Sequence, residues 1–117
     1  LASYILITLS ILDIQNGDYA SAISNLGSNA SYNKALAQLL NGDATSAVST
    51  INNSDDAKTA QGFYLKAVAA ARQNKLQDVI SNLTNVFAQD ASLKAKASKD
   101  REFLNYMENV SFSALVK

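Results

Sequence analysis

Apolar residues return along this chain at the spacing of an α-helix, every three or four positions between short polar breaks. Leu1, Ile5, Leu9 and Leu12 form one such stripe. A stripe of this period lies on one face of a helix, whereas a half-buried strand would alternate at every second position. The pattern predicts an all-α chain with helices over about 2–15, 18–26, 30–40, 43–52, 56–73, 76–88 and 91–108.

Two polar triplets separate neighbouring helices in this pattern. Both have the sequence Asn-Gly-Asp, at residues 16–18 and 41–43. Glycine readily takes the left-handed conformation that ends a helix, and the aspartate side chain can accept a hydrogen bond from the first amides of the next helix. Proline is absent and only four glycines occur among the 117 residues, so the chain has few other helix breakers. Each triplet therefore predicts a tight helix–helix turn.

The residues around the turns repeat. When Gly17, Gly42 and Asn74 are aligned, a small residue lies seven positions before each and a small or β-branched residue lies five positions after. Antiparallel helices approach closely only where small side chains meet. We therefore expect one domain over residues 1–117 with about three antiparallel hairpins, at about 2–26, 30–52 and 56–88, and a terminal helix at about 91–108. The small positions are Ser10, Ala35 and Ala67 before the turns, and Ala22, Ala47 and Val79 after them.

At these positions the chain resembles the tetratricopeptide-repeat (TPR) family. Asn-Lys-Ala at residues 33–35, followed by the turn at 41–43, is similar to the first helix and turn of such a repeat, and residues 86–90 resemble the end of its second helix. The chain departs from the family pattern where Ala91 replaces the usual proline and Asn74 replaces the turn glycine. The 25-residue spacing from Gly17 to Gly42 is also shorter than the family's unit of about 34 residues. The resemblance implies a TPR-like α-solenoid, a right-handed stack of these hairpins with the helix at about 91–108 as a capping helix.

A second resemblance concerns the later part of the chain. Residues 64–72 and 97–103 look like TPR regions of cell-envelope proteins of the Bacteroidota. This resemblance implies a place in the bacterial cell envelope, in the periplasm or associated with the outer membrane.

Composition argues against catalysis. The chain has no histidine and no cysteine, so the commonest general base, the thiol nucleophile and the usual zinc ligands are all missing. The adjacent Asp55 and Asp56 are a candidate carboxylate pair, but we interpret them as the capping residues of a helix start. Ser98 and Lys99 are neighbours in a predicted helix and point about 100° apart, which does not suit a catalytic dyad. We therefore expect no enzyme activity, no cofactor and no metal.

The charges also argue against nucleic acid as a partner. Lys and Arg together number ten, as do Asp and Glu, so the formal net charge is zero. Phosphate contacts supply most of the affinity for nucleic acids, and they require a basic surplus. The alternating charges over residues 94–102 are best interpreted as a solvated helix face with local ion pairs.

The remaining function is recognition of another protein or a peptide. In stacked hairpins, the first helix of each pair lines a concave surface that can hold a partner. Tyrosine and arginine are common anchors of such interfaces, although the tyrosines of repeat proteins also pack between hairpins. If that alternative holds, the domain is a structural or self-association module of a larger protein. The predicted groove residues are Ile7, Ile11, Tyr32, Leu36, Leu39, Tyr64, Val68 and Arg72, with Ile14 continuing the first set.

The first predicted helix offers a separate contact surface. It is apolar on two stripes, so one stripe is expected to pack on a preceding repeat of a longer protein or on a second copy of the chain. Its apolar run, residues 1–12, is about half the length that a membrane span requires. The apolar tail over 110–116 either serves the same purpose or frays. The two stripes are Leu1, Ile5, Leu9 and Leu12, and Ile7, Ile11 and Ile14.

Overall fold

The computed structural model describes residues 15–26 and 30–117. Within these ranges the chain consists of helices and turns, without strands, which confirms the all-α prediction. The chain divides into two compact units, Leu1–Ala57 and Lys58–Lys117, which are described separately below. The expectation of a single domain stays a prediction. The helix predicted over about 2–15, with Ser10, Ile7, Ile11 and Ile14, lies outside the described residues except at its end, where Gln15 is helical.

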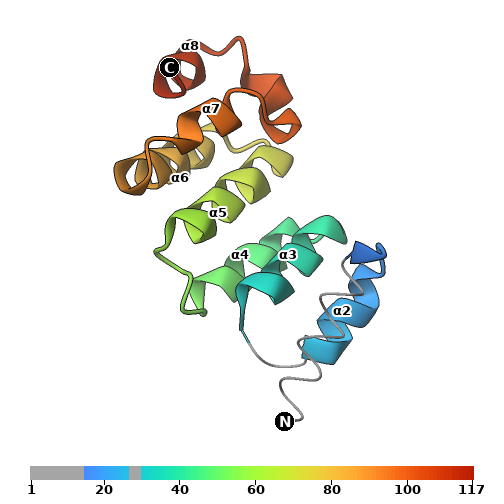
Figure 1. Cartoon of the computed structure of the whole chain (residues 1–117). Helices are drawn as coiled ribbons and strands as arrows, with labels where there is room; N and C mark the ends of the chain where they lie inside the picture. Colours follow the sequence, from blue (N-terminus) through green and yellow to red (C-terminus); the bar gives the residue numbers. More distant parts are fainter. Residues whose placement is uncertain (1–14, 27–29) are drawn as a thin grey trace. The chain divides into compact units, whose positions relative to one another are not determined.

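The first unit contains three described helices, α2 (Tyr19–Leu26), α3 (Tyr32–Leu40) and α4 (Ala44–Asn52). Helix α3 packs against both α2 and α4 (Figure 1). Alanines that the sequence repeat singled out lie at these contacts, because Ala22, Ala35 and Ala47 have no exposed surface. Leu26 and Ile51 fill the space beside them and are also buried. Small side chains therefore permit the close approach of these helices, as predicted.

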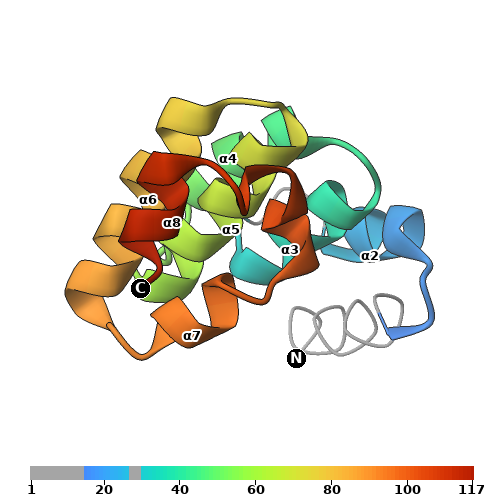
Figure 2. The same ribbon diagram turned by 90° about the horizontal axis from the view of Figure 1, so that it is seen from above.

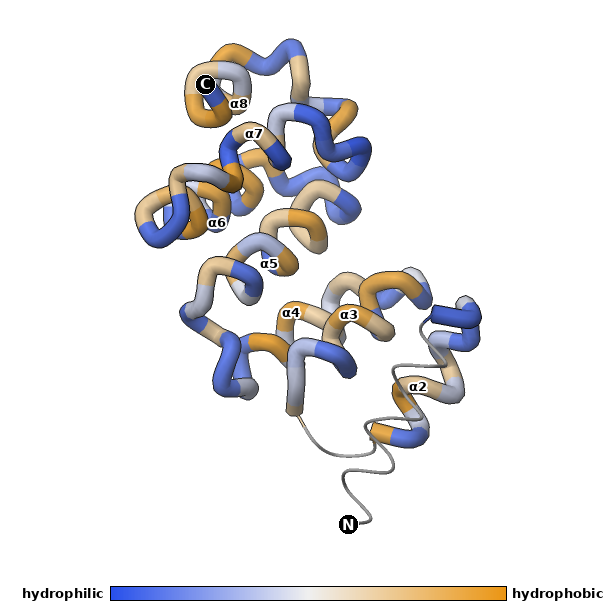
Figure 3. The backbone as a smooth tube through the Cα atoms, viewed as in Figure 1, coloured by the Kyte–Doolittle hydropathy of each residue, from blue (hydrophilic) through white to orange (hydrophobic). Residues whose placement is uncertain are grey.

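The second unit contains α5 (Ala60–Arg72), α6 (Leu76–Gln89), α7 (Leu93–Ala97), the 3₁₀ helix η1 (Arg101–Tyr106) and α8 (Val110–Leu115). Helices α5 and α6 form the hairpin, and Ala67 and Val79 are fully buried in it. Hydrophobic residues recur along both helices of this hairpin (Figure 3). The 3₁₀ helix packs on α5, whereas α7 and α8 pack on α6 (Figure 2).

The turns between paired helices share one hydrogen-bond pattern. Gly42 has a φ of 89° and donates its amide to the Leu39 carbonyl, while the Asp43 amide bonds to Gln38. Asn74, with a φ of 59°, makes the equivalent bond to Ala71, and its neighbour Lys75 bonds to Ala70. This is the Schellman arrangement, in which a left-handed residue ends the helix. The predicted turns are therefore confirmed.

The predicted helix caps are confirmed at two of the turns. The Asp43 side chain accepts a hydrogen bond from the Ser46 amide at 3.0 Å, which begins α4. Asp18 accepts one from the Ser21 amide at 3.2 Å, which begins α2. Each cap satisfies one of the amides that lack a partner at the start of a helix.

One helix start was predicted wrongly. Asp55 and Asp56 were expected to cap a helix that begins near residue 56, but α5 begins at Ala60. The Thr59 hydroxyl accepts the hydrogen bond from the Gly62 amide, so Thr59 is the cap. The residues before Thr59 form turns. In these turns the Ser54 hydroxyl donates a hydrogen bond to the Ile51 carbonyl and accepts one from the Asp56 amide.

The predicted capping helix over about 91–108 is also wrong as a continuous helix. The chain leaves α7 at Ser98, whose hydroxyl bonds back to the Ala95 carbonyl. Asp100 is extended, with φ −77° and ψ 123°, and its side chain accepts from the Glu102 amide to start η1. The break turns Phe103 inward, where it is fully buried. Burial of this aromatic side chain outweighs the helix propensity of a segment rich in lysine and alanine.

The apolar tail forms part of the interior of the second unit. Asn109 caps α8 by accepting a hydrogen bond from the Phe112 amide at 3.1 Å. The Phe112 ring is fully buried, and its centroid lies 5.6 Å from that of Phe103. The segment that was expected to fray or to serve as a contact surface therefore supplies a buried aromatic side chain.

None of the helices within residues 15–26 and 30–117 combines the length and apolar character that spanning a membrane requires.

Substitution of Gly42 tests the role of the left-handed turn. A β carbon at this position would meet no atom within 4 Å, so the cost of Gly42→Val comes from backbone conformation alone. We expect the free energy of unfolding to fall by about 1–2 kcal/mol, measured by urea denaturation. Gly42→Asn is the matched control and should cost much less, because Asn74 already adopts this conformation. Equal stability of Gly42→Val and the native chain would contradict the assignment.

Candidate peptide-binding face

The predicted groove residues fall into two sets, one in each unit. In the first unit, Tyr32 and Leu36 are half-buried on α3 and Leu39 is buried. In the second unit, Tyr64 and Val68 are buried on α5, and Arg72 is exposed. Ile7 and Ile11 lie outside the described residues.

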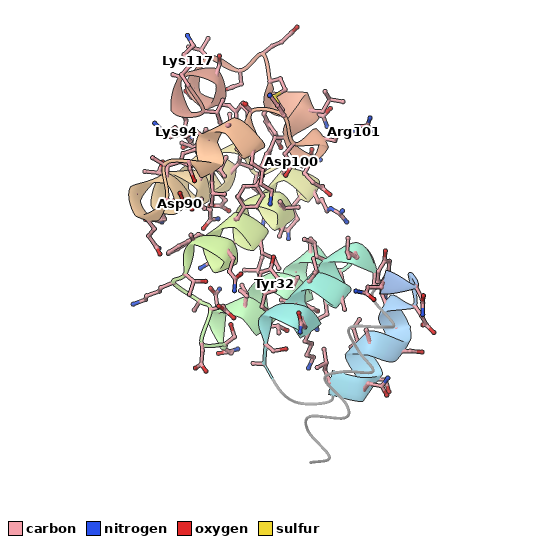
Figure 4. All side chains as sticks on the ribbon, viewed as in Figure 1. Tyr32, Asp90, Lys94, Asp100, Arg101 and Lys117 are labelled. Atoms are coloured by element: carbon pink, nitrogen blue, oxygen red, sulfur yellow. The ribbon has the colours of Figure 1, made fainter. Side chains whose placement is uncertain are left out.

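The α3 set lies near the start of its helix. The Ser31 hydroxyl accepts a hydrogen bond from the Lys34 amide at 3.1 Å, so Tyr32 is the first helical residue. Figure 4 labels its side chain. Burial raises the pKa of the Tyr32 phenol, and the negative charge of Asp56 adds to the shift. Leu36 and Leu39 follow at helical spacing, so the three side chains share one side of α3.

The α5 set forms a continuous face, because Tyr64, Val68 and Arg72 are spaced four residues apart along the helix. We call these three residues the α5 face. Residues 96–106 of the same chain contact this face, and η1 packs on the helix. Two of the three residues that were predicted to meet a partner, Tyr64 and Arg72, therefore already contact the C-terminal segment.

Tyr64 makes three kinds of contact with this segment. Its hydroxyl donates a hydrogen bond of 2.6 Å to Oδ2 of Asp100. Its ring meets Phe103 edge to face, with centroids 5.8 Å apart and planes inclined at 69°. In the third contact, the Lys96 ammonium lies 4.6 Å from the centroid of the Tyr64 ring, within range of a cation–π interaction. These contacts are of the kind expected if Tyr64 packs within the structure.

Arg72 binds the segment two helical turns further along α5. Its Nε donates to Oε1 of Glu102 at 3.0 Å and its Nη2 donates to Oε2 at 2.6 Å. This two-point geometry matches the planar guanidinium to the carboxylate. Both side chains are 33% exposed, so water and salt screen the pair and its contribution to stability is about 1 kcal/mol or less.

Tyr106 closes the contact at the end of η1. Its hydroxyl donates a long hydrogen bond of 3.4 Å to the Ala71 carbonyl. Its ring centroid lies 6.5 Å from that of Phe112. The segment is thus joined to α5 by polar bonds at both ends of η1 and by the buried Phe103 ring between them.

Asp100 and Glu102 were expected to form local ion pairs on a solvated helix face, but their partners lie on α5 instead. The two carboxylates bind Tyr64 and Arg72, whereas Arg101 between them is exposed and points outward (Figure 4). A signal for this arrangement was present in the sequence. Phe103 is an aromatic residue at the end of a charged run, and such a side chain is expected to find a buried position.

The surroundings of Tyr64 keep its phenol protonated. Burial is the main cause of the raised pKa, followed by the hydrogen bond to Asp100 and by the charges of Asp100 and Glu102. A neutral phenol donates a hydrogen bond to a carboxylate, and deprotonation would place two negative oxygens in contact. The hydrogen bond therefore depends on Tyr64 remaining neutral.

The side chains of the α5 face can bind carboxylates and an aromatic ring. The phenol and guanidinium are donors, and the Tyr64 ring accepts an apolar partner. In the part of the chain that the structure describes, no three acidic side chains gather in a way that could hold a metal ion. Comparison with known proteins finds no matching family, no matching curated protein and no matching solved structure.

Removal of the Tyr64 hydroxyl gives a pH-dependent prediction. The folded-state pKa lies above the ordinary value of 10.0, so this group stabilises the fold fully below about pH 10, and the stabilisation is lost as pH rises further. Near neutral pH, Tyr64→Phe should lower the free energy of unfolding by about 1–2 kcal/mol. Above about pH 10 the difference from the native chain should shrink, as measured by urea denaturation.

The other tyrosines are present in both chains, so their titration cancels in this comparison. A difference that stays constant between about pH 8 and about pH 11 would show that the Tyr64 phenol does not titrate with folding.

Proposed function

We propose that this chain is a non-catalytic scaffold of stacked TPR-like hairpins that binds another protein or a peptide. Its architecture in this proposal is a right-handed stack of about three antiparallel hairpins, with the C-terminal segment as its cap. The α3–α4 and α5–α6 pairs support the proposal, because they share the same turn pattern and the same buried small residues. Repetition of one supersecondary unit is the basis of solenoid architectures.

The observation that carries the binding proposal is the way in which the α5 face holds a short segment that is not α-helical. Side chains make the contacts, through the Tyr64 hydroxyl, the Tyr64 ring and the Arg72 guanidinium. Tyrosine and arginine supply much of the binding energy of protein interfaces. A helix face that holds one segment in this way has the chemistry needed to bind a segment of a partner.

A second candidate is a structural or self-association module of a larger protein, with no ligand on its helix faces. The burial of Tyr64 and Val68 favours this candidate, as does the pairing of Arg72 within the chain. The two candidates differ in the role of α3. A partner that binds the first unit in the predicted groove contacts the half-buried Tyr32 and Leu36, whereas a purely structural module makes no such contact.

Site-specific photo-crosslinking separates these candidates. In the test chain a benzophenone amino acid replaces Leu36 of α3. In the matched control chain it replaces Thr45, an exposed residue of α4 in the same unit. If the scaffold proposal holds, irradiation in cells should join the Leu36 chain to one discrete protein, identified by mass spectrometry, and the Thr45 chain should give no such adduct. Adducts that contain only a second copy of the chain would favour self-association. Identical adducts at both positions, or none, would contradict the scaffold proposal.

A further inference from the structure

Residues 100–103 present a short chemical pattern to the α5 face. The pattern has two acidic residues separated by one residue of any type, and an aromatic residue follows them. In this chain the four residues are Asp100, Arg101, Glu102 and Phe103. The two carboxylates bind the two donors of the α5 face, and the aromatic ring is fully buried. Arg101, at the free position, is exposed. The pattern that the face accepts is therefore Asp-x-Glu-Phe.

The α5 face is complementary to this pattern along its length. Tyr64 and Arg72 lie eight residues apart, which places their α carbons about 12 Å apart along the helix. The Arg72 guanidinium belongs to this face and pairs with Glu102, so an acidic segment meets favourable charge there. A basic segment in the same place would meet like charges.

The resident segment is held on α5 by the buried Phe103 ring and by polar contacts. Its polar contacts to α5 are few, and the Arg72–Glu102 pair is partly exposed to water. The 3₁₀ hydrogen bonds of η1 have poorer geometry than those of an α-helix. Such elements open locally at a lower free energy than the whole fold.

We propose that the α5 face is a recognition surface for acidic–aromatic segments of the Asp-x-Glu-Phe type, and that residues 100–103 are its resident occupant. This inference rests on the proposed function and names the class of partner. A partner segment with the same pattern competes with the resident one for Tyr64 and Arg72. Its apparent affinity is lowered by the small fraction of chains in which the face is open. A change within the resident segment that weakens its contact with the α5 face therefore strengthens binding of the partner.

A peptide-binding experiment on the full chain tests the proposal. The probe is a fluorescent peptide with the sequence of residues 97–117, and the control peptide carries D100N and E102Q. Glu102→Arg in the full chain sets two cations against each other and weakens the resident contact, but leaves Tyr64 and Arg72 intact. Fluorescence anisotropy should give an apparent Kd for the native peptide about three- to tenfold lower with this variant than with the native chain. The control peptide should bind the variant about tenfold more weakly than the native peptide.

Equal binding of the two peptides, or no binding of the native peptide to any chain, would overturn the proposal. Circular dichroism checks that Glu102→Arg is folded. If it is not, Glu102→Gln replaces it, with a smaller expected gain in affinity in the same direction. This outcome is independent of crosslinking at Leu36, which lies in the other unit. If the peptide experiment fails but crosslinking at Leu36 gives a specific adduct, this inference is rejected and the scaffold proposal stands.

Discussion

Burial of helix α5 on two sides is the constraint on which the second unit depends. Of its thirteen residues, eight are buried, among them a run of alanines at residues 69–71. Helix α6 covers one side and η1 packs on the helix as well. Because alanine side chains are short, neighbouring backbones approach closely and gain dispersion contacts over their whole length. Leu83 and Phe103, which are fully buried, add larger side chains to the same interior.

Polar contacts give the C-terminal segment its register on this apolar base. The buried Phe103 and Phe112 rings contribute most of the stabilisation, since burial of an aromatic side chain is worth about 2–3 kcal/mol. The Tyr64–Asp100 and Arg72–Glu102 contacts contribute less, because both are partly exposed to solvent. They are directional, however, and a shift of the segment along α5 would break both. We expect the same two contributions in the proposed binding of partner segments. An aromatic side chain supplies affinity, and the carboxylates supply selectivity.

The parts of the fold that local chemistry determines were predictable from the sequence. Gly42 and Asp43 specify a turn and a cap within a few residues, and the bounds of α4 and α6 were predicted to within one residue at each end. The start of α5 was missed because Asp55, Asp56 and Thr59 are all good caps, and their order gives no reason to prefer Thr59. The break near Asp100 was missed because its cause is tertiary. The segment has high helix propensity, and the contact that interrupts it joins residues 36 positions apart.

The candidate site was predictable in the same limited sense. Helical spacing placed Tyr64, Val68 and Arg72 on one face, and the structure confirms that they share it. No local signal indicates that the chain's own C-terminal segment meets this face, because sequence periodicity assigns residues to a face and not to a partner.

The dependence of α5 on the C-terminal segment can be measured by native-state hydrogen exchange. Phe103→Ala removes the buried ring, and Leu104→Ala removes a neighbouring side chain that is 67% exposed. The account predicts that the free energy of exchange for the α5 amides falls by about 3–5 kcal/mol in Phe103→Ala and hardly changes in Leu104→Ala. Unchanged protection of α5 in Phe103→Ala, or equal losses in the two variants, would contradict it.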